Sequence, residues 1–333
     1  MMKIGIFKEC NGGAARFRGY SEKAYPGQFD YVDFDTLLSE ESLHLIAENA
    51  IEGLIYFNDR RFAPSLWQKA AAAGVRYIAI PAVGHDFVDM PLMRALGIRV
   101  SYVPGYSPNA VSEHTVLLTL ALLRHFREQL LRTEKCDYRI DDLRARELRS
   151  MTVGVIGTGR IGATTIRCLS GFGCRRICAY DLFPNNALRG YADYADFETV
   201  LAESDILLFH CALNDQTRKM IDRSALCRMK DGVILVNTAR ADLFDMDAVV
   251  EALDSGKIGA LGLDVIDGES LLKENPLPGR CPLPLLDNLL ARPNVIYTRH
   301  TAFYTDRADE DIIKAAVDGL YHMTHGIVTP AEL

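Results

Sequence analysis

The chain has 333 residues, 49% of them hydrophobic and 24% charged, which is ordinary for a soluble globular protein and long enough for two domains. Its formal net charge of −7 argues against nucleic acid or an anionic membrane as a partner, because both select a basic surface. Eight cysteines at irregular spacing, no signal peptide and no apolar stretch of membrane-spanning length predict a cytoplasmic protein with reduced thiols.

Short apolar segments alternate with helical patterns over the first hundred residues. Such alternation predicts a parallel sheet that helices cover on both faces. The predicted strands are residues 3–7, 53–57, 77–80 and 98–102, and the predicted helices between them are residues 39–49, 63–73 and 90–95.

A long apolar helix is predicted next, from Asn109 to about Leu131, because Pro108 is placed to open it. A second alternating series begins at Met151, and a final helix is predicted from a cap at Thr305 to about His325. The later strands predicted in this series are residues 205–210, 232–237, 260–265 and 294–298.

The most informative motif follows the apolar segment 151–156, where Gly157, Gly159 and Gly162 form a G-x-G-x-x-G turn before a helix. In a dinucleotide site these glycines permit a tight turn, a close approach to the pyrophosphate and close helix–strand packing. Asp181 ends the next strand, where a carboxylate accepts ribose hydroxyls and repels a 2′-phosphate. A lone glycine motif is often a mere turn, but strand, helix and acid together predict an NAD site.

Three further strand ends carry side chains suited to reducing a 2-keto acid. Arg240 follows one predicted strand and offers a planar fork that grips a carboxylate. His300 follows another and is of the residue type that donates a proton near neutral pH. Glu269 lies five residues beyond the strand-ending Asp264, and a carboxylate beside a histidine favours its protonated form. Each residue alone could be structural, but jointly they predict an active site in a cleft between two α/β domains. No metal site is expected, since His322 and His325 lack companion ligands.

These motifs together resemble the D-isomer-specific 2-hydroxyacid dehydrogenase family, and within it the D-lactate and D-2-hydroxyisocaproate branch. The resemblance covers nearly the whole chain and rests on residues 103–110, the glycine motif, and residues 237–240, 264–269 and 300–305. It implies two doubly wound parallel-sheet domains. Residues 1–101 and 300–333 would form a discontinuous, flavodoxin-like substrate domain, and residues 102–299 a Rossmann-type NAD domain. It also implies a homodimer with the long helix after Pro108 at its interface.

The resemblance assigns roles to individual residues. Arg240 would bind the substrate carboxylate and polarise the carbonyl, His300 would be the acid and base, and Glu269 would pair with His300. Asp264 would hold the nicotinamide carboxamide. The residues implied in binding the cofactor are Gly157, Gly159, Arg160, Ile161, Gly162, Asp181, Cys211, Ala212, Thr238, Ala239 and Asp264, and those implied in binding the substrate are Phe57, Val83, Gly84, Tyr106 and Phe303.

Some positions depart from the family pattern. Cys211-Ala212 stands where Val-Pro is usual, Ala241-Asp242 where Gly is common, and Asp267 where Glu is frequent. Pro81 replaces a usual Arg, and Arg299 a usual Pro. The last two are expected on either side of the cleft, where they bear on substrate choice. If Arg299 turned toward His300 it would disfavour a protonated imidazole, so its side chain is expected to point into solvent or onto an acid.

The function expected from the sequence is reversible, NADH-dependent reduction of a small or medium 2-keto acid to the D-2-hydroxy acid, as in a D-lactate dehydrogenase. A D-2-hydroxyisocaproate or phenyllactate type of dehydrogenase and a hydroxypyruvate or glyoxylate reductase remain alternatives. Formate dehydrogenase is disfavoured, because it needs no paired acid and Glu269 is present. A non-catalytic, NAD-sensing protein of the corepressor kind is the alternative outside the enzymes.

Overall fold

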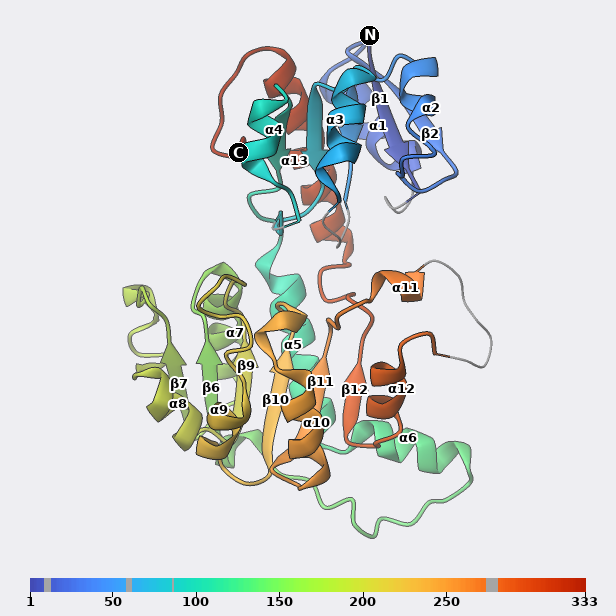
Figure 1. The fold of residues 1–333 in the computed structure, drawn as a ribbon. Helices are drawn as coiled ribbons and strands as arrows, with labels where there is room; N and C mark the ends of the chain where they lie inside the picture. Colours follow the sequence, from blue (N-terminus) through green and yellow to red (C-terminus); the bar gives the residue numbers. More distant parts are fainter. Residues whose placement is uncertain (9–12, 58–61, 86, 274–280) are drawn as a thin grey trace. The chain divides into compact units, whose positions relative to one another are not determined.

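The computed structural model describes all residues except 9–12, 58–61, 86 and 274–280, and the chain divides into two units. The first unit consists of Met1–Ser107 and Thr305–Leu333, and the second of Pro108–Tyr304. The domain boundaries expected from the sequence lie after residues 101 and 299, whereas the units of the structure meet after Ser107 and Tyr304. Each unit contains one parallel sheet with helices on both faces, as Figure 1 shows. The α/β class predicted from the alternating pattern is confirmed.

The first unit contains a five-stranded sheet in the order β2-β1-β3-β4-β5. This is the order of the flavodoxin-like doubly wound fold, in which the chain winds outward in both directions from the first strand. The strands are β1 (Met2–Phe7), β2 (Phe29–Phe34), β3 (Gly53–Ile55), β4 (Tyr77–Ile80) and β5 (Arg99–Tyr102), and the helices are α1 (Gly13–Ala24), α2 (His44–Glu48), α3 (Pro64–Ala72), α4 (Met90–Ala95) and α13 (Asp306–Thr324).

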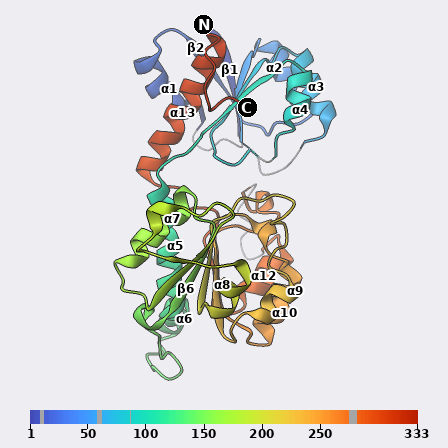
Figure 2. The same ribbon diagram turned by 90° about the vertical axis from the view of Figure 1, so that its left-hand side faces the viewer.

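Alternating side chains of this sheet build two cores. On β1, Ile4 and Ile6 pack into the core that includes α1 and α13, whereas Phe7 packs into the core that includes α3 and α4. Figures 1 and 2 show these two pairs of helices on opposite faces of the sheet. The C-terminal helix α13 therefore completes the first unit. The Thr305 side chain accepts a hydrogen bond from the backbone of Ala308, which confirms the predicted cap.

The second unit contains a seven-stranded sheet in the order β12-β11-β10-β9-β6-β7-β8. Counted from β6, this is the Rossmann order, and the winding reverses between β6 and β9. The strands are β6 (Thr152–Ile156), β7 (Arg176–Tyr180), β8 (Asp193–Tyr194), β9 (Ile206–Phe209), β10 (Val233–Asn237), β11 (Ile258–Leu263) and β12 (Val295–Tyr297). The helices are α5 (Pro108–Leu123), α6 (Phe126–Glu134), α7 (Arg160–Ser170), α8 (Phe197–Glu203), α9 (Arg223–Arg228), α10 (Met246–Asp254), α11 (Ser270–Lys273) and α12 (Pro284–Leu290), with short 3-10 turns at Leu148–Ser150, Asn186–Leu188 and Ala241–Leu243.

The central strands of this sheet are buried on both faces, which explains their unbroken apolar sequence. On β9, Leu207 and Phe209 join the core under α8, α9 and α10, while Ile206 and Leu208 join the core under α5 and α7. Figure 2 shows α5 and α7 on one face and α9, α10 and α12 on the other. The sheet thereby fixes where β6, β9, β10, β11 and β12 end, and those carboxyl ends lie along one edge.

Several local features differ from the sequence-based prediction. The predicted helix 39–49 is helical only over His44–Glu48, and strand β8 was not predicted. The predicted helix from Asn109 to about Leu131 is two helices, because His125 adopts a left-handed backbone with φ of 50° between α5 and α6. Helix α1 and strand β2 were not predicted. Strand β2 lies at the edge of its sheet and carries Asp30 and Asp33, charges that protect an edge but weaken the strand pattern.

Candidate active site

The glycine motif forms the turn between β6 and α7, and each glycine meets a different constraint. Gly157 has a φ of +92°, and a Cβ there would lie 2.6 Å from the backbone nitrogen of Cys211. A Cβ on Gly162 would lie 2.0 Å from the carbonyl oxygen of Gly157. By contrast, a Cβ on Gly159 would meet no atom within 4 Å, so this side of the turn is open to a ligand. Arg160 and Ile161 then open α7, whose N-cap Gly159 supplies no side-chain acceptor. The first amide groups of a helix have no acceptor within it and are suited to bind phosphate.

Asp181 follows β7 and is held beside this turn. Its Oδ2 accepts hydrogen bonds from the backbone nitrogen of Thr158 at 2.6 Å and from the Thr158 hydroxyl at 3.1 Å, and its Oδ1 accepts one from the Phe183 nitrogen at 2.9 Å. Three donors hold this carboxylate in one orientation. An open glycine turn, a helix N-terminus and an oriented acid fit a dinucleotide whose adenosine ribose carries a free 2′-hydroxyl, as in NAD.

Cys211 and Ala212 follow β9 beside the glycine turn, at the positions where the family usually has Val-Pro. The Cys211 sulfur packs 3.8 Å from the sulfur of Met220, and burial raises the pKa of its thiol to about 11. Cys211 is therefore a neutral thiol at physiological pH and replaces valine as a small apolar group.

His210 lies between β9 and Cys211, beside the glycine turn, and its Nε2 is shielded from solvent with no hydrogen-bond partner in the described part of the chain. Burial lowers the pKa of His210 from 6.5 to about 4. The ring is thus neutral at physiological pH. Gly157 packs directly against the backbone of His210 and Cys211, so His210 helps to support the glycine turn.

We predict from this that His210 makes the protein sensitive to acid. The unfolded chain binds a proton at His210 below pH 6.5, but the folded chain does so only near pH 4, so stability falls as the pH decreases through this window. The full contribution is up to about 3 kcal/mol. Chemical denaturation of the wild type and of His210→Gln between pH 7 and about 4 measures it. The variant should lose less stability over this range, and identical pH dependence would contradict the assignment.

The catalytic candidates Glu269 and His300 lie side by side. His300 Nδ1 is 2.5 Å from Glu269 Oε1, and the two side chains are 28% and 8% exposed. Arg299 and His300 both adopt left-handed backbone, with φ of 61° and 55°, in the turn after β12. Arg299 is exposed, and its positive φ explains why the proline usual in the family does not fit this backbone.

Asp264 directly follows β11 and holds the turn that carries His300. Its side chain is 1% exposed, and its carbonyl accepts the His300 amide at 2.6 Å. Its carboxylate accepts the Thr301 amide at 2.9 Å, the Ala302 amide at 3.0 Å and the Thr298 hydroxyl at 2.6 Å. The sequence-based role of Asp264 was to bind the nicotinamide carboxamide, and the structure adds this second role, which the strand pattern did not reveal.

His114 of α5 extends this network and was not among the predicted site residues. Its Nε2 lies 2.8 Å from the Thr298 hydroxyl and 3.6 Å from the Asp264 carboxylate. Because Thr298 donates its own proton to Asp264, its oxygen accepts from His114, which fixes the proton of His114 on Nε2. Burial lowers the pKa of His114, in keeping with a neutral ring. The turn under His300 is thus anchored from α5 as well as from β11.

Arg240 follows β10, two strands from β12, and its turn is held by Asn237. The Asn237 side chain donates to the Arg240 carbonyl at 2.7 Å and accepts from the Ala239 amide at 2.9 Å. The Thr238 hydroxyl is 2.9 Å from that of Thr115, and an Arg240 guanidinium nitrogen donates to the Ala239 carbonyl at 2.8 Å.

The structure accommodates Ala241 and Asp242 after Arg240, where the family commonly has glycine. Neither residue has a positive φ, and Asp242 pairs with Arg218.

The predicted substrate residues divide between the two units. Phe57, Val83, Gly84 and Tyr106 belong to the first unit, and Phe303 belongs to the second. Phe57 packs edge-on against Phe87 with ring centroids 5.9 Å apart, and Val83 is 40% exposed. Phe303 stands perpendicular to the His300 ring at 6.0 Å, so it is the predicted wall that lies directly beside the catalytic candidate.

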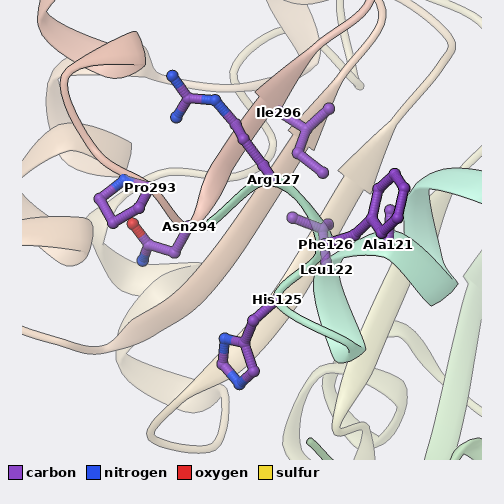
Figure 3. A pocket seen from close by; sticks show the side chains of 8 residues that line it. All are labelled: Ala121, Leu122, His125, Phe126, Arg127, Pro293, Asn294 and Ile296. Atoms are coloured by element: carbon purple, nitrogen blue, oxygen red, sulfur yellow. The ribbon is translucent and has the colours of Figure 1, made fainter. Parts of the chain in front are cut away.

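The second unit also contains a small pocket away from the candidate active site. It has room for about one water molecule, and Figure 3 shows Arg127 and Phe126 lining it opposite Pro293 and Asn294. These last two residues precede β12, whereas the candidate site follows the carboxyl ends of the strands. The pocket is therefore separate from the candidate site. No helix in the described parts of the chain is both long and apolar enough to cross a membrane.

Comparison with known proteins agrees with this geometry. The family model "D-isomer specific 2-hydroxyacid dehydrogenase, NAD binding domain" matches residues 116–302. D-lactate dehydrogenase of Escherichia coli (strain K12) is 35% identical over 308 residues, which cover 92% of each chain. Aromatic 2-oxoacid reductase of Clostridium sporogenes is 37% identical over 254 residues, 76% of this chain and 77% of that protein. The solved pyruvate reductase of Chlamydomonas reinhardtii is 32% identical, covers 99% of this chain and 98% of its own, and gives a TM-score of 0.88.

The chain therefore belongs to the D-isomer-specific 2-hydroxyacid dehydrogenase family. It is an NAD-dependent oxidoreductase that acts on 2-hydroxy acids, and the resemblance inferred from the glycine motif and the three strand ends is confirmed.

Proposed function

We propose that this enzyme uses NADH to reduce pyruvate and other small or medium 2-keto acids to D-2-hydroxy acids, reversibly, as a D-lactate dehydrogenase. The observation that carries the proposal is the contact of 2.5 Å between His300 and Glu269, at the sheet edge that also carries the glycine turn. An imidazole beside a largely buried carboxylate is suited to donate a proton to a carbonyl oxygen.

His300 is the acid in the reducing direction. Its Nδ1 is committed to Glu269, so Nε2 is the atom that gives its proton to the carbonyl oxygen of the substrate. Glu269 fixes the orientation of the ring through this contact. The bound NADH supplies the hydride. Arg240 grips the substrate carboxylate with its planar fork and polarises the adjacent carbonyl.

We predict that Glu269→Gln moves the alkaline limb of the pH profile of kcat/KM for reduction to lower pH. Without the carboxylate the protonated imidazole is less favoured, so His300 loses its proton earlier as the pH rises. Asp267→Asn is the matched control, because Asp267 is exposed and two residues away. A limb that moves in Asp267→Asn but not in Glu269→Gln would assign the paired acid to Asp267 instead.

The proposed site for the substrate's side chain is apolar. Phe57, Tyr106 and Phe303 are proposed as aromatic walls, which favour an apolar side chain because each buried methylene adds about 0.8 kcal/mol. Backbone groups of Val83 and Gly84 are proposed to meet the substrate carboxylate. The relatives include enzymes named for lactate and for aromatic 2-oxo acids, which supports a preference within this range.

Initial rates of NADH oxidation test the proposed range. Pyruvate, 2-ketoisocaproate and phenylpyruvate should be the better substrates, and Phe57→Ala should shift preference toward the larger ones. Glyoxylate or hydroxypyruvate as the best substrate would replace the proposal by the corresponding reductase. Oxaloacetate as the best substrate, with that preference lost in Arg299→Ala, would make Arg299 a specificity residue. NADH binding without turnover on any of them would favour the non-catalytic alternative.

We also propose that the enzyme is a cytoplasmic homodimer formed through α5, α6 and the segment after them. The support is a group of large apolar side chains, all at least 50% exposed, on this part of the second unit: Leu117, Phe126, Leu130, Tyr138 and Ile140. Figure 1 shows α6 and the segment after it projecting from the second sheet. Sedimentation equilibrium should give twice the 37.0 kDa chain mass, and a monomer would contradict the proposal.

A further inference from the structure

A series of hydroxyl groups links the edge of the second sheet to Asp181. The Tyr194 hydroxyl donates to the Thr158 hydroxyl at 2.8 Å, and the Thr158 hydroxyl in turn lies 3.1 Å from Asp181 Oδ2. The Thr158 amide donates to the same carboxylate oxygen at 2.6 Å. Thr158 is 2% exposed, so water is not at hand to replace a lost partner.

The direction of each hydrogen bond in this series follows from the carboxylate of Asp181, with which the series ends. An ionised carboxylate only accepts, so the Thr158 hydroxyl must donate to Asp181 and can then only accept from Tyr194. The Tyr194 oxygen is itself fixed from the other side, because the backbone N–H of Asn185 donates to it at 2.9 Å. Each hydroxyl group between β8 and Asp181 therefore has a single hydrogen-bond acceptor.

This series joins three segments that are separate in the sequence. Thr158 belongs to the glycine turn, Asp181 to the end of β7, and Tyr194 to β8, a strand of two residues at the sheet edge. Strand β8 pairs with β7 through Ala179 and Tyr194, which brings the tyrosine alongside the acid's own strand. The sheet thus positions Tyr194 to hold the turn and the acid in one arrangement.

We propose that Tyr194 is a positioning residue for the adenosine end of NADH, acting through Thr158 to hold Asp181 in the orientation that accepts a ribose hydroxyl. Two donors from Thr158 occupy Oδ2, and Oδ1, with one backbone donor, keeps acceptor capacity for the ribose. A 2′-phosphate brings only acceptors and negative charge to this carboxylate. The inference rests on the proposed role of Asp181 and extends the site to a residue outside the glycine motif.

A double-mutant cycle tests the inference. Tyr194→Phe removes one hydroxyl and should raise the Kd of NADH about two- to tenfold, the value of one neutral hydrogen bond. The turnover number at saturating NADH should stay unchanged. In a Thr158→Val background the same change should have no further effect, because the acceptor is already gone. Tyr191→Phe is the control, since Tyr191 is 48% exposed and lies outside the series.

ADP-ribose is the probe that separates this inference from the catalytic proposal, because it carries the adenosine end and no nicotinamide. Its Kd, measured by calorimetry, should rise in Tyr194→Phe as that of NADH does, whether or not the enzyme reduces pyruvate. The preference for NADH over NADPH should narrow in Tyr194→Phe and narrow further in Asp181→Ser. Unchanged Kd values with a lower melting temperature would show a merely structural tyrosine. A full Tyr194→Phe effect in the Thr158→Val background would equally overturn the inference.

Discussion

Replacing His300 by alanine should lower kcat for 2-keto acid reduction by about 10²- to 10⁴-fold, the range of general acid–base catalysis. The proton donor is lost, but the glycine turn and Asp181 are made by other strand ends and remain intact. The Kd of NADH, measured by fluorescence titration, should therefore stay close to that of the wild type. Hydride transfer without a donor at the carbonyl oxygen leaves an alkoxide that only water can protonate.

His44→Ala is the control for this experiment, because His44 is exposed and lies at the start of α2. It should leave kcat unchanged. Retained turnover in His300→Ala would remove His300 from the chemistry. Loss of NADH binding together with turnover would show that the turn after β12 had collapsed, and His300→Gln would then distinguish lost chemistry from lost structure.

Replacing Arg240 by lysine should also lower kcat/KM strongly, although the positive charge is kept. An ammonium group is a point charge and cannot form the two parallel hydrogen bonds of a guanidinium, so at least one charge-assisted bond to the carboxylate is lost. Such a bond contributes about 1.5–3 kcal/mol, which corresponds to a loss of roughly 10- to 150-fold in kcat/KM. Steady-state kinetics with pyruvate measures this loss.

Arg218→Lys is the matched control, because Arg218 is half-exposed and pairs with Asp242 next to the Arg240 turn. It should have little effect, since an exposed ion pair contributes little and lysine can keep it. If Arg240→Lys behaved like this control, Arg240 would act as a general positive charge rather than as a fork that binds the carboxylate.

The second unit could be predicted well from the sequence because its signals are local. The apolar segment 152–156, three spaced glycines and Asp181 lie within about one βαβ unit, and each has a stereochemical reason that needs no distant partner. The strand ends at Arg240 and His300 could also be placed, because parallel strands bring their carboxyl ends to the same edge.

The residues that the sequence did not reveal act over long separations. His114 contacts Thr298 across 184 positions, and Tyr194 reaches Thr158 across 36. Nothing in the local pattern distinguishes these side chains from ordinary helix or strand residues. The break at His125 is similar, because neither glycine nor proline marks it. Tertiary contacts, rather than local propensity, decide all three.

The configuration of the lactate formed from pyruvate tests the proposed D-specific reduction. Pyruvate and NADH are converted by the enzyme, and the lactate is resolved by chiral chromatography. We expect D-lactate alone, since an enzyme that presents hydride and acid from fixed positions reduces one face of the carbonyl. L-lactate, or a racemic product, would contradict it.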